Sequence, residues 1–187
     1  QVPNLTPIES MVSKSVREQY EENPYPRWIK ASREVKSKTV GELLQGAPLD
    51  FDLGEYVSPE SPEILIAGCG TGQHAVSTAS RFSNVRMLAL DLSLSSLSYA
   101  MRKTNELGSS NIEYAQADIM ELGALGRQFD VIESSGVLHH LGDPVAGWRV
   151  LVDLLRSGGL MNIGLYSEAA RKNIVSTRNM IAERGYE

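Results

Sequence analysis

The chain lacks several residue types and patterns that mark particular classes of protein. It contains one cysteine, Cys69, which excludes an internal disulfide and a cysteine-based metal cluster. It has no run of 18 or more apolar residues, so the sequence predicts no membrane-spanning helix. Its first residues do not show the basic segment followed by an apolar one that is typical of a signal peptide. We therefore expect a cytoplasmic protein with no metal site and no membrane partner.

An excess of basic residues is also missing. The formal net charge is −5, whereas domains that bind nucleic acid usually carry a basic patch, so we expect no nucleic-acid partner. There is no internal repeat, and 42% apolar with 22% charged residues is typical of a globular domain. The chain does not begin with methionine, which favours a piece of a longer protein.

Two regions differ in their patterns. In residues 1–62, Thr6 to Glu9 has the form of a capping box. An apolar stripe at helical spacing then predicts a helix that ends at Asn23-Pro24. Residues 25–62 are irregular, with room for one short helix over residues 40–44. We expect this N-terminal segment to form a cap, and residues 63–187 to form the core.

The core alternates between apolar runs and helical patterns. The expected strands are 64–67, 85–90, 112–116, 129–133 and 160–166. The expected helices are 72–82, 93–107, 143–155 and 167–184, with Gly158-Gly159 as the turn into the last strand. This alternation predicts an α/β fold with a doubly wound, mainly parallel sheet, a Rossmann-like architecture. Ligands of such sheets bind at the carboxyl ends of the strands.

A glycine-rich loop follows the first strand, with Gly68, Gly70 and Gly72 in the spacing G-x-G-x-G. The dinucleotide fingerprint G-x-G-x-x-G would place its third glycine at position 73, which is Gln73 here. This difference argues against a nicotinamide dinucleotide. A tight turn between strand and helix also favours glycine, so the loop alone does not identify a ligand.

Two carboxylates follow successive strands. Asp91 ends the second strand, where an acidic side chain can accept hydrogen bonds from ribose hydroxyls. Asp118 follows the third strand and could accept from an exocyclic amine, with Ile119 and Met120 against a flat ring. In the alternative interpretation, both residues cap the helices that follow them. Together with the glycine loop, they favour a nucleoside without a 2′-phosphate.

The most specific signal is a set of motifs, namely ILIAGCGTG at 64–72, Asp91, and VIESSGVLHHL at 131–141. This set resembles the class I S-adenosylmethionine-dependent methyltransferases over about residues 63–166. The resemblance implies a Rossmann-like methyltransferase fold, with S-adenosyl-L-methionine as cofactor and S-adenosyl-L-homocysteine as product. Members typically finish with a sixth and a seventh strand. After Tyr166 the sequence leaves no room for them, so we expect a C-terminally incomplete core.

The resemblance also implies a set of cofactor-binding residues. The glycines would pack against the amino-acid part of the cofactor, Asp91 and Leu92 would bind the ribose, and Ser135 would face the methionine moiety. Asp118 and Ile119 would hold the adenine.

The segment 20–28 (YEENPYPRW) carries a second resemblance, to methyltransferase domains of bacterial proteins with upstream tetratricopeptide repeats. This resemblance implies a repeat domain in the full-length protein. Tyr20, Tyr25 and Trp28 could close over the cofactor and place an aromatic face near the sulfonium. Tyr20 also belongs to the helical stripe, which favours a packing role for it.

Three residues are candidates for acid–base catalysis. His139 and His140 follow the fourth strand, and imidazole titrates near neutral pH. In the family this pair belongs to the structural motif and is not generally a catalytic base. Glu133 ends the same strand, where it could act near the sulfonium or serve as a structural carboxylate. We expect His74 to be a packing or capping residue, and Cys69 to be an inert filler of the loop.

The sequence therefore predicts methyl transfer from S-adenosylmethionine to an unidentified acceptor, which is either a small molecule or a protein. We expect in-line displacement that depends mainly on positioning. One alternative is a non-catalytic module or scaffold that binds S-adenosylmethionine. A less favoured alternative is an NAD-dependent oxidoreductase.

Overall fold

The computed structural model describes residues 2–32, 36–46, 57, 59–167 and 169–185. Its strands are β1 (Glu63–Ala67), β2 (Arg86–Asp91), β3 (Ile112–Gln116), β4 (Phe129–Ser135) and β5 (Leu155–Gly164). They form one sheet in the order β3-β2-β1-β4-β5, and each neighbouring pair is parallel. The strand order reverses between β1 and β4, which is where such sheets bind ligands. The predicted doubly wound fold is confirmed.

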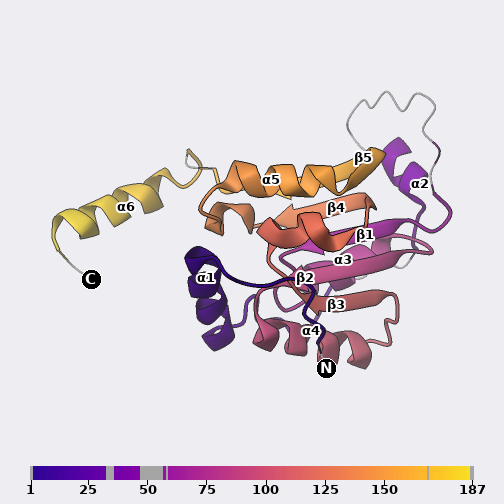
Figure 1. Ribbon diagram of the computed structural model, residues 1–187, viewed down its shortest axis with the longest axis horizontal. Coiled ribbons are helices and arrows are strands. Elements are labelled where there is room, and N and C mark those ends of the chain that lie inside the picture. The colour runs from indigo at the N-terminus through magenta and orange to yellow at the C-terminus, as the bar shows by residue number, and fades with distance from the viewer. Residues whose placement is uncertain (1, 33–35, 47–56, 58, 168, 186–187) are drawn as a thin grey trace.

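Helices cover both faces of this sheet (Figure 1). The α-helices of the described chain are α1 (Met11–Glu22), α2 (Val40–Gln45), α3 (Gln73–Arg81), α4 (Leu94–Glu106), α5 (Pro144–Asp153) and α6 (Lys172–Glu183). Two 3-10 helices, η1 (Ile119–Leu125) and η2 (Leu138–His140), follow β3 and β4. Helix α6 extends away from the sheet, and none of its side chains is buried in the described part of the chain (Figure 1).

The core consists of two apolar clusters, one on each face of the sheet. Ile64 and Ile66 of β1 pack in the cluster that contains Leu97 of α4. Leu65, which points to the opposite face, packs in the cluster that contains Leu151 of α5. Because helices cover both faces, β1 is a continuous apolar run and does not alternate with polar residues.

The N-terminal residues differ from their prediction. Helix α1 begins at Met11 with Ser10 as its N-cap, so the expected capping box at Thr6 is wrong. Thr6 is buried, and its hydroxyl oxygen accepts a hydrogen bond of 2.8 Å from the backbone N–H of Asp118. The carbonyl of Pro3 accepts another, of 2.8 Å, from the backbone N–H of Gln116 at the end of β3. These contacts with the sheet edge hold the first residues extended, and no helix forms there.

The last strand and the last helix also differ from their predicted bounds. Strand β5 begins at Leu155, five residues before the expected Leu160, and Phe129 pairs with Leu155 while Val131 pairs with Leu160. The expected turn at Gly158-Gly159 is therefore an irregularity inside the strand. The expected helix over residues 167–184 begins at Lys172. Residues 47–56 and 58, part of the segment expected to be irregular, lie outside the described residues.

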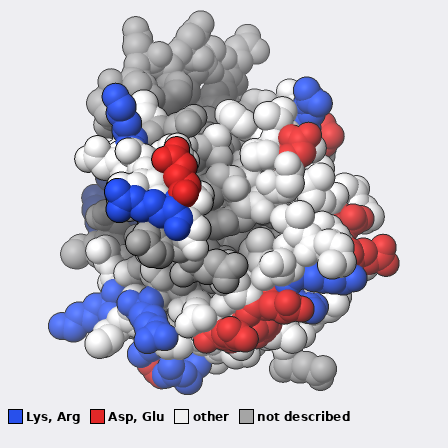
Figure 2. Space-filling view, turned by 90° about the vertical axis from the view of Figure 1, so that its left-hand side faces the viewer, with Lys and Arg blue, Asp and Glu red and all other residues white. Residues whose placement is uncertain are grey.

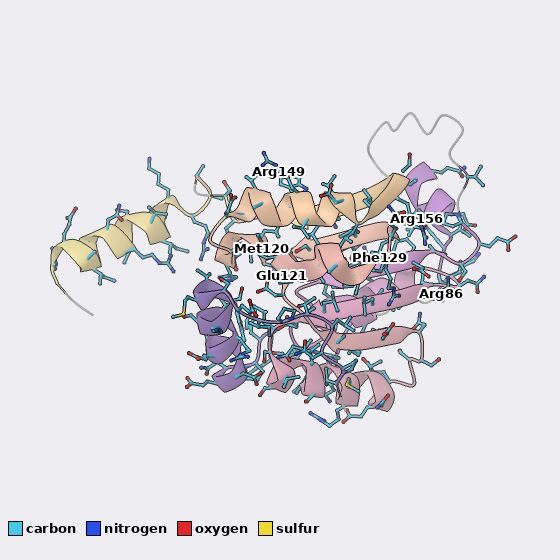
Figure 3. The ribbon with its side chains drawn as sticks, in the orientation of Figure 1. Arg86, Met120, Glu121, Phe129, Arg149 and Arg156 are labelled. Carbon is cyan, nitrogen blue, oxygen red and sulfur yellow. The ribbon has the colours of Figure 1, made fainter. Side chains whose placement is uncertain are left out.

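The two ends of the sheet differ in character. At the amino ends of the strands, Glu63 pairs with Arg86 at 2.8 Å and with Arg156 at 3.7 Å, and Asp130 pairs with Arg156 at 2.6 Å. Figure 3 shows Arg86 and Arg156 at the end of the sheet far from α1. The opposite end, where α1 and the glycine loop lie, is the carboxyl end, at which sheets of this kind bind their ligands.

Surface features add little to this picture. On the face drawn in Figure 2, basic and acidic side chains are interspersed. Within the described residues, no helix has both the length and the apolar character that crossing a membrane would need.

Candidate active site

A cavity of about 600 Å³ opens at the carboxyl ends of the strands, at the reversal of strand order between β1 and β4. Its volume is within the range of roughly 300–1,000 Å³ that is usual for small-molecule sites. The glycine loop, the residues after β2, β3 and β4, helix α1 and the segment after α1 all contribute to its wall. The topology thus brings together residues that lie far apart in the chain.

The glycine loop forms the floor of the cavity and is tied to the end of β2. The backbone N–H groups of Gly68 and Cys69 both donate to the carbonyl of Leu90 at 2.8 Å. Gly68 and Gly70 line the cavity, as expected. Gly72 does not, because its Cα faces α4, where an added Cβ would overlap Ala100. In the structure Gly72 packs the loop against α4, and its expected contact with a cofactor stays a prediction.

Asp91 connects the loop to the end of β2. Its Oδ2 accepts a hydrogen bond of 2.7 Å from the backbone N–H of Gly70, and its Oδ1 accepts one of 3.0 Å from that of Ser93. Desolvation raises the pKa of the Asp91 carboxyl above its ordinary value. Asp91 and Leu92 both line the cavity. Ser93, and not Asp91, is the N-cap of α4, so capping does not explain Asp91.

The position of Asp118 is compatible with both roles that the sequence leaves open. Its Oδ1 accepts from the backbone N–H of Met120 at 3.0 Å, which caps η1. Asp118 also lines the cavity together with Ala117 and Ile119. Carboxylates for hydroxyl and amine groups, with apolar side chains beside them, fit the chemistry of a nucleoside. The residues present are therefore suited to the cofactor that the resemblance implies.

The segment after α1, residues 23–32, is docked on the glycine loop through hydrogen bonds to Thr71. The backbone N–H of Thr71 donates to the carbonyl of Tyr25 at 3.2 Å, and its hydroxyl donates to that of Pro26 at 2.5 Å. The indole N–H of Trp28 donates to the carbonyl of Thr71 at 3.0 Å. Tyr20 and Tyr25 line the cavity, whereas Trp28 is buried outside the lining and anchors the segment.

The end of α1 is fixed to α4 by Glu21, a residue that no sequence pattern singles out. Its carboxylate accepts hydrogen bonds from the backbone N–H groups of Leu94 at 2.6 Å and Ser95 at 3.0 Å. Burial raises the pKa of Glu21, but the hydrogen bonds from Ser95 outweigh it and the pKa is lowered. The partners are 74 residues apart, so no local pattern signals the contact.

The two histidines after β4 have different surroundings. His140 lines the cavity, and its Nε2 lies 3.3 Å from the hydroxyl oxygen of Tyr20. His139 is not part of the lining, and its ring centroid lies 4.0 Å from that of Tyr166. Burial lowers the pKa of both imidazoles below the ordinary value of 6.5. Of the pair, the structure brings only His140 to the cavity.

Glu133 is enclosed beneath the cavity and engaged by neighbours from α3. It is 4% exposed, and its carboxylate contacts His74 Nε2 and Thr78 Oγ1 at 2.7 Å each and Arg81 Nη2 at 3.1 Å. Burial raises its pKa, but the hydrogen bonds from His74 and Thr78 and the charge of Arg81 lower it overall. Glu133 does not line the cavity. Of the two roles that the sequence leaves open for Glu133, these contacts favour the structural one.

The structure brings further side chains to the wall near β4. Ser135 lines the cavity, as the resemblance implies, together with Asn162 of the neighbouring β5. His74, which the sequence analysis expected to pack or cap, also lines it. The buried Cys69 lies there as well, and burial raises the pKa of its thiol well above its usual range.

Comparison with known proteins identifies relatives of this chain. Residues 64–159 match a family model described as a methyltransferase domain. An uncharacterized protein of Synechococcus sp. is 34% identical over 122 residues, which are 65% of this chain and 29% of that protein. Malonyl-[acyl-carrier protein] O-methyltransferase of Acetivibrio thermocellus is 30% identical over 131 residues, 70% of this chain and 42% of that enzyme. The chain thus spans less than half the length of these relatives.

Solved structures share the fold. PKMT2 from Rickettsia typhi, in complex with AdoHcy, aligns with a TM-score of 0.58 and 21% identity over 67% of this chain and 25% of that one. The [4+2]-cyclase SpnF aligns with a TM-score of 0.57 and 19% identity over 87% and 60%. The matched residues 64–159 form most of the sheet and supply both cavity carboxylates. The chain therefore belongs to the methyltransferase domain family, and its sheet has the Rossmann-like core fold of the class I S-adenosylmethionine-dependent methyltransferases.

Proposed function

We propose that this chain is the catalytic core of an enzyme that moves a methyl group from S-adenosylmethionine to an acceptor by in-line displacement. One observation carries the proposal: Asp91, Asp118 and the glycine loop line a single cavity that α1 and Tyr25 close from the other side. The cofactor supplies a methyl group on a sulfonium, which is activated for displacement. Positioning of reactants can contribute roughly 7–11 kcal/mol of barrier reduction.

The proposed cofactor contacts follow from the chemistry of the wall. Asp91 would accept hydrogen bonds from the ribose hydroxyls, beside Leu92. Asp118 would accept from the adenine amine, and Ala117 and Ile119 would pack against the ring. The carboxylates and the apolar residues lie on the same wall, so the nucleoside end of the cofactor would lie beside β2 and β3.

The acceptor would occupy the part of the cavity near α1. This part contains the apolar side chains of Val12, Val16 and Leu141 and the polar groups of Tyr20 and His140. Burial lowers the pKa of His140, so its ring is unprotonated at neutral pH. We assign to His140 the removal of a proton from an acceptor hydroxyl or amine, and to Tyr20 the orientation of the ring.

The chemical identity of the acceptor does not carry over from the relatives. Two of them are named after different acceptors, a malonyl-[acyl-carrier protein] and trans-aconitate. The structural neighbour named a [4+2]-cyclase indicates that the fold by itself does not impose methyl transfer. A module that binds S-adenosylmethionine without catalysis is therefore the alternative function, and either a small molecule or a protein could be the partner.

A two-stage experiment tests the proposal. Calorimetry first compares binding of S-adenosylmethionine, S-adenosylhomocysteine and NAD, and a preference for NAD contradicts the cofactor assignment. A screen for transfer of labelled methyl to a panel of small-molecule and protein acceptors follows, with His140→Gln as the matched variant. Transfer that depends on His140 supports the enzyme. Tight binding without transfer to any acceptor supports the binding module.

A further inference from the structure

His74 lies in the first turn of α3 and is held in one orientation by a buried carboxylate. Its Nε2 is 2.7 Å from Glu133 Oε2, and Glu133 has further partners in Thr78 and Arg81. An ionised carboxylate only accepts hydrogen bonds, so Nε2 carries a hydrogen and donates it. The ring is thereby fixed by a partner that lies outside the cavity.

The second ring nitrogen of His74 is available to a ligand. Nδ1 makes no hydrogen bond within the described part of the chain, and the side chain is 32% exposed and lines the cavity. When the imidazole is protonated, both nitrogens donate. The ring can then present a charged N–H to an anion, while Glu133 balances its charge on the other side.

The position of His74 in the sheet indicates which part of a ligand it faces. Asp91 and Asp118 follow β2 and β3, whereas Glu133 belongs to β4, on the other side of β1. A nucleoside held by the two aspartates therefore leaves the amino-acid end of the cofactor beside the glycine loop and His74. None of the described lining residues is a lysine or an arginine that could bind the cofactor's carboxylate.

We propose that His74, oriented by Glu133, binds the α-carboxylate of S-adenosylmethionine. This role rests on the proposed function, because it requires that cofactor to occupy the cavity. It assigns a purpose to the buried Glu133, a charged group that lies under the cavity without lining it.

The test compares two cofactors that differ only in the carboxylate. Calorimetry measures the binding of S-adenosylmethionine and of decarboxylated S-adenosylmethionine to the unchanged chain and to His74→Leu. We expect the variant to bind S-adenosylmethionine roughly ten- to hundredfold more weakly, the usual worth of a hydrogen bond to a charged group. Its affinity for the decarboxylated compound should not change. An equal loss for both compounds, or no loss for either, overturns the proposal.

Two further variants separate binding from folding. Thr78→Val removes another donor to Glu133 without altering the cavity wall, and should keep the unchanged chain's ratio of the two affinities. His74→Gln keeps an N–H for Glu133 but cannot carry a charge, and should show the same selective loss if His74→Leu does not fold. An unchanged chain that binds neither compound contradicts the proposed function itself, whatever the variants do.

Discussion

The carbonyl oxygen of Tyr25 occupies the space that a Cβ on Gly70 would need. The segment after α1 therefore approaches the glycine loop as closely as it does because position 70 carries no side chain. Gly70 also has a φ of 54°, in the left-handed region that favours glycine. The absence of a side chain at position 70 thus lets the segment after α1 pack directly against the loop that forms the floor of the cavity.

Gly70→Ala is expected to displace the segment after α1 from the glycine loop. Gly126→Ala is the matched control, because Gly126 has a similar φ of 64° and no atom within 4 Å of an added Cβ. The control should lower the free energy of unfolding by about 1 kcal/mol through backbone strain alone. Gly70→Ala should lower the free energy of unfolding by more than the control does, and it should also weaken S-adenosylhomocysteine binding. Thermal melts and calorimetry check both, and equal effects of the two variants would contradict a role for the contact with Tyr25.

Asp91→Asn is expected to separate stability from binding. Desolvation raises the pKa of Asp91 above 3.8, so the folded state loses stability as pH rises from that value through the raised pKa. The amide removes this penalty but has one acceptor oxygen for the N–H groups of Gly70 and Ser93, so the two effects oppose each other and the stability of the free chain at pH 7 should change little. S-adenosylhomocysteine should bind roughly ten- to hundredfold more weakly, because charged hydrogen bonds are lost. Calorimetry that finds undiminished affinity would refute the ribose assignment.

Glu133→Gln is expected to destabilise the fold. The net pKa of Glu133 is lowered below 4.5, so its contribution is present above pH 4.5 and is lost as pH falls through the lowered value. Removing one member of a buried ionic cluster should cost roughly 3 kcal/mol at pH 7. Glu106→Gln, which breaks exposed pairs with Arg102 and Lys103, should change the stability little. Urea titrations at pH 7 and pH 4 measure both variants, and equal costs would contradict the structural assignment of Glu133.

The pKa of His140 is expected to set the acidic limb of the pH profile of kcat/KM. The pKa of His140 lies below 6.5, so kcat/KM should rise as pH rises through this lowered pKa and should be level at pH 7. His140→Gln should remove the limb and lower the rate roughly 10²–10⁴-fold. Tyr20→Phe should keep the limb but move it to lower pH, because a ring that takes the proton on Nδ1 donates from Nε2 to the Tyr20 oxygen, and the protonated ring then loses this acceptor. A limb that persists in His140→Gln would exclude this residue as the base.

Much of the fold follows from local patterns. Strand β3 was predicted with the bounds 112–116 that the structure has, because a short buried run between polar turns has few alternatives. Asp91 and Asp118 could be selected as ligand-binding candidates because parallel strands bring their carboxyl ends to one edge. Strand β5 was less well predicted, since an irregular pairing with β4 depends on the partner strand.

Local patterns in the chain are therefore enough to predict the alternation of strands and helices, the edge of the sheet that holds the cavity, and the resemblance of the motifs to a family. Three-dimensional packing is needed to show that Thr6 supports Asp118, that Glu21 fixes α1 to α4, and that His74 reaches the cavity while Glu133 does not. The partners in the first two contacts lie 112 and 74 residues apart. Periodicity reports only how a segment distributes its own side chains, so contacts between distant segments emerge only when the whole chain is packed.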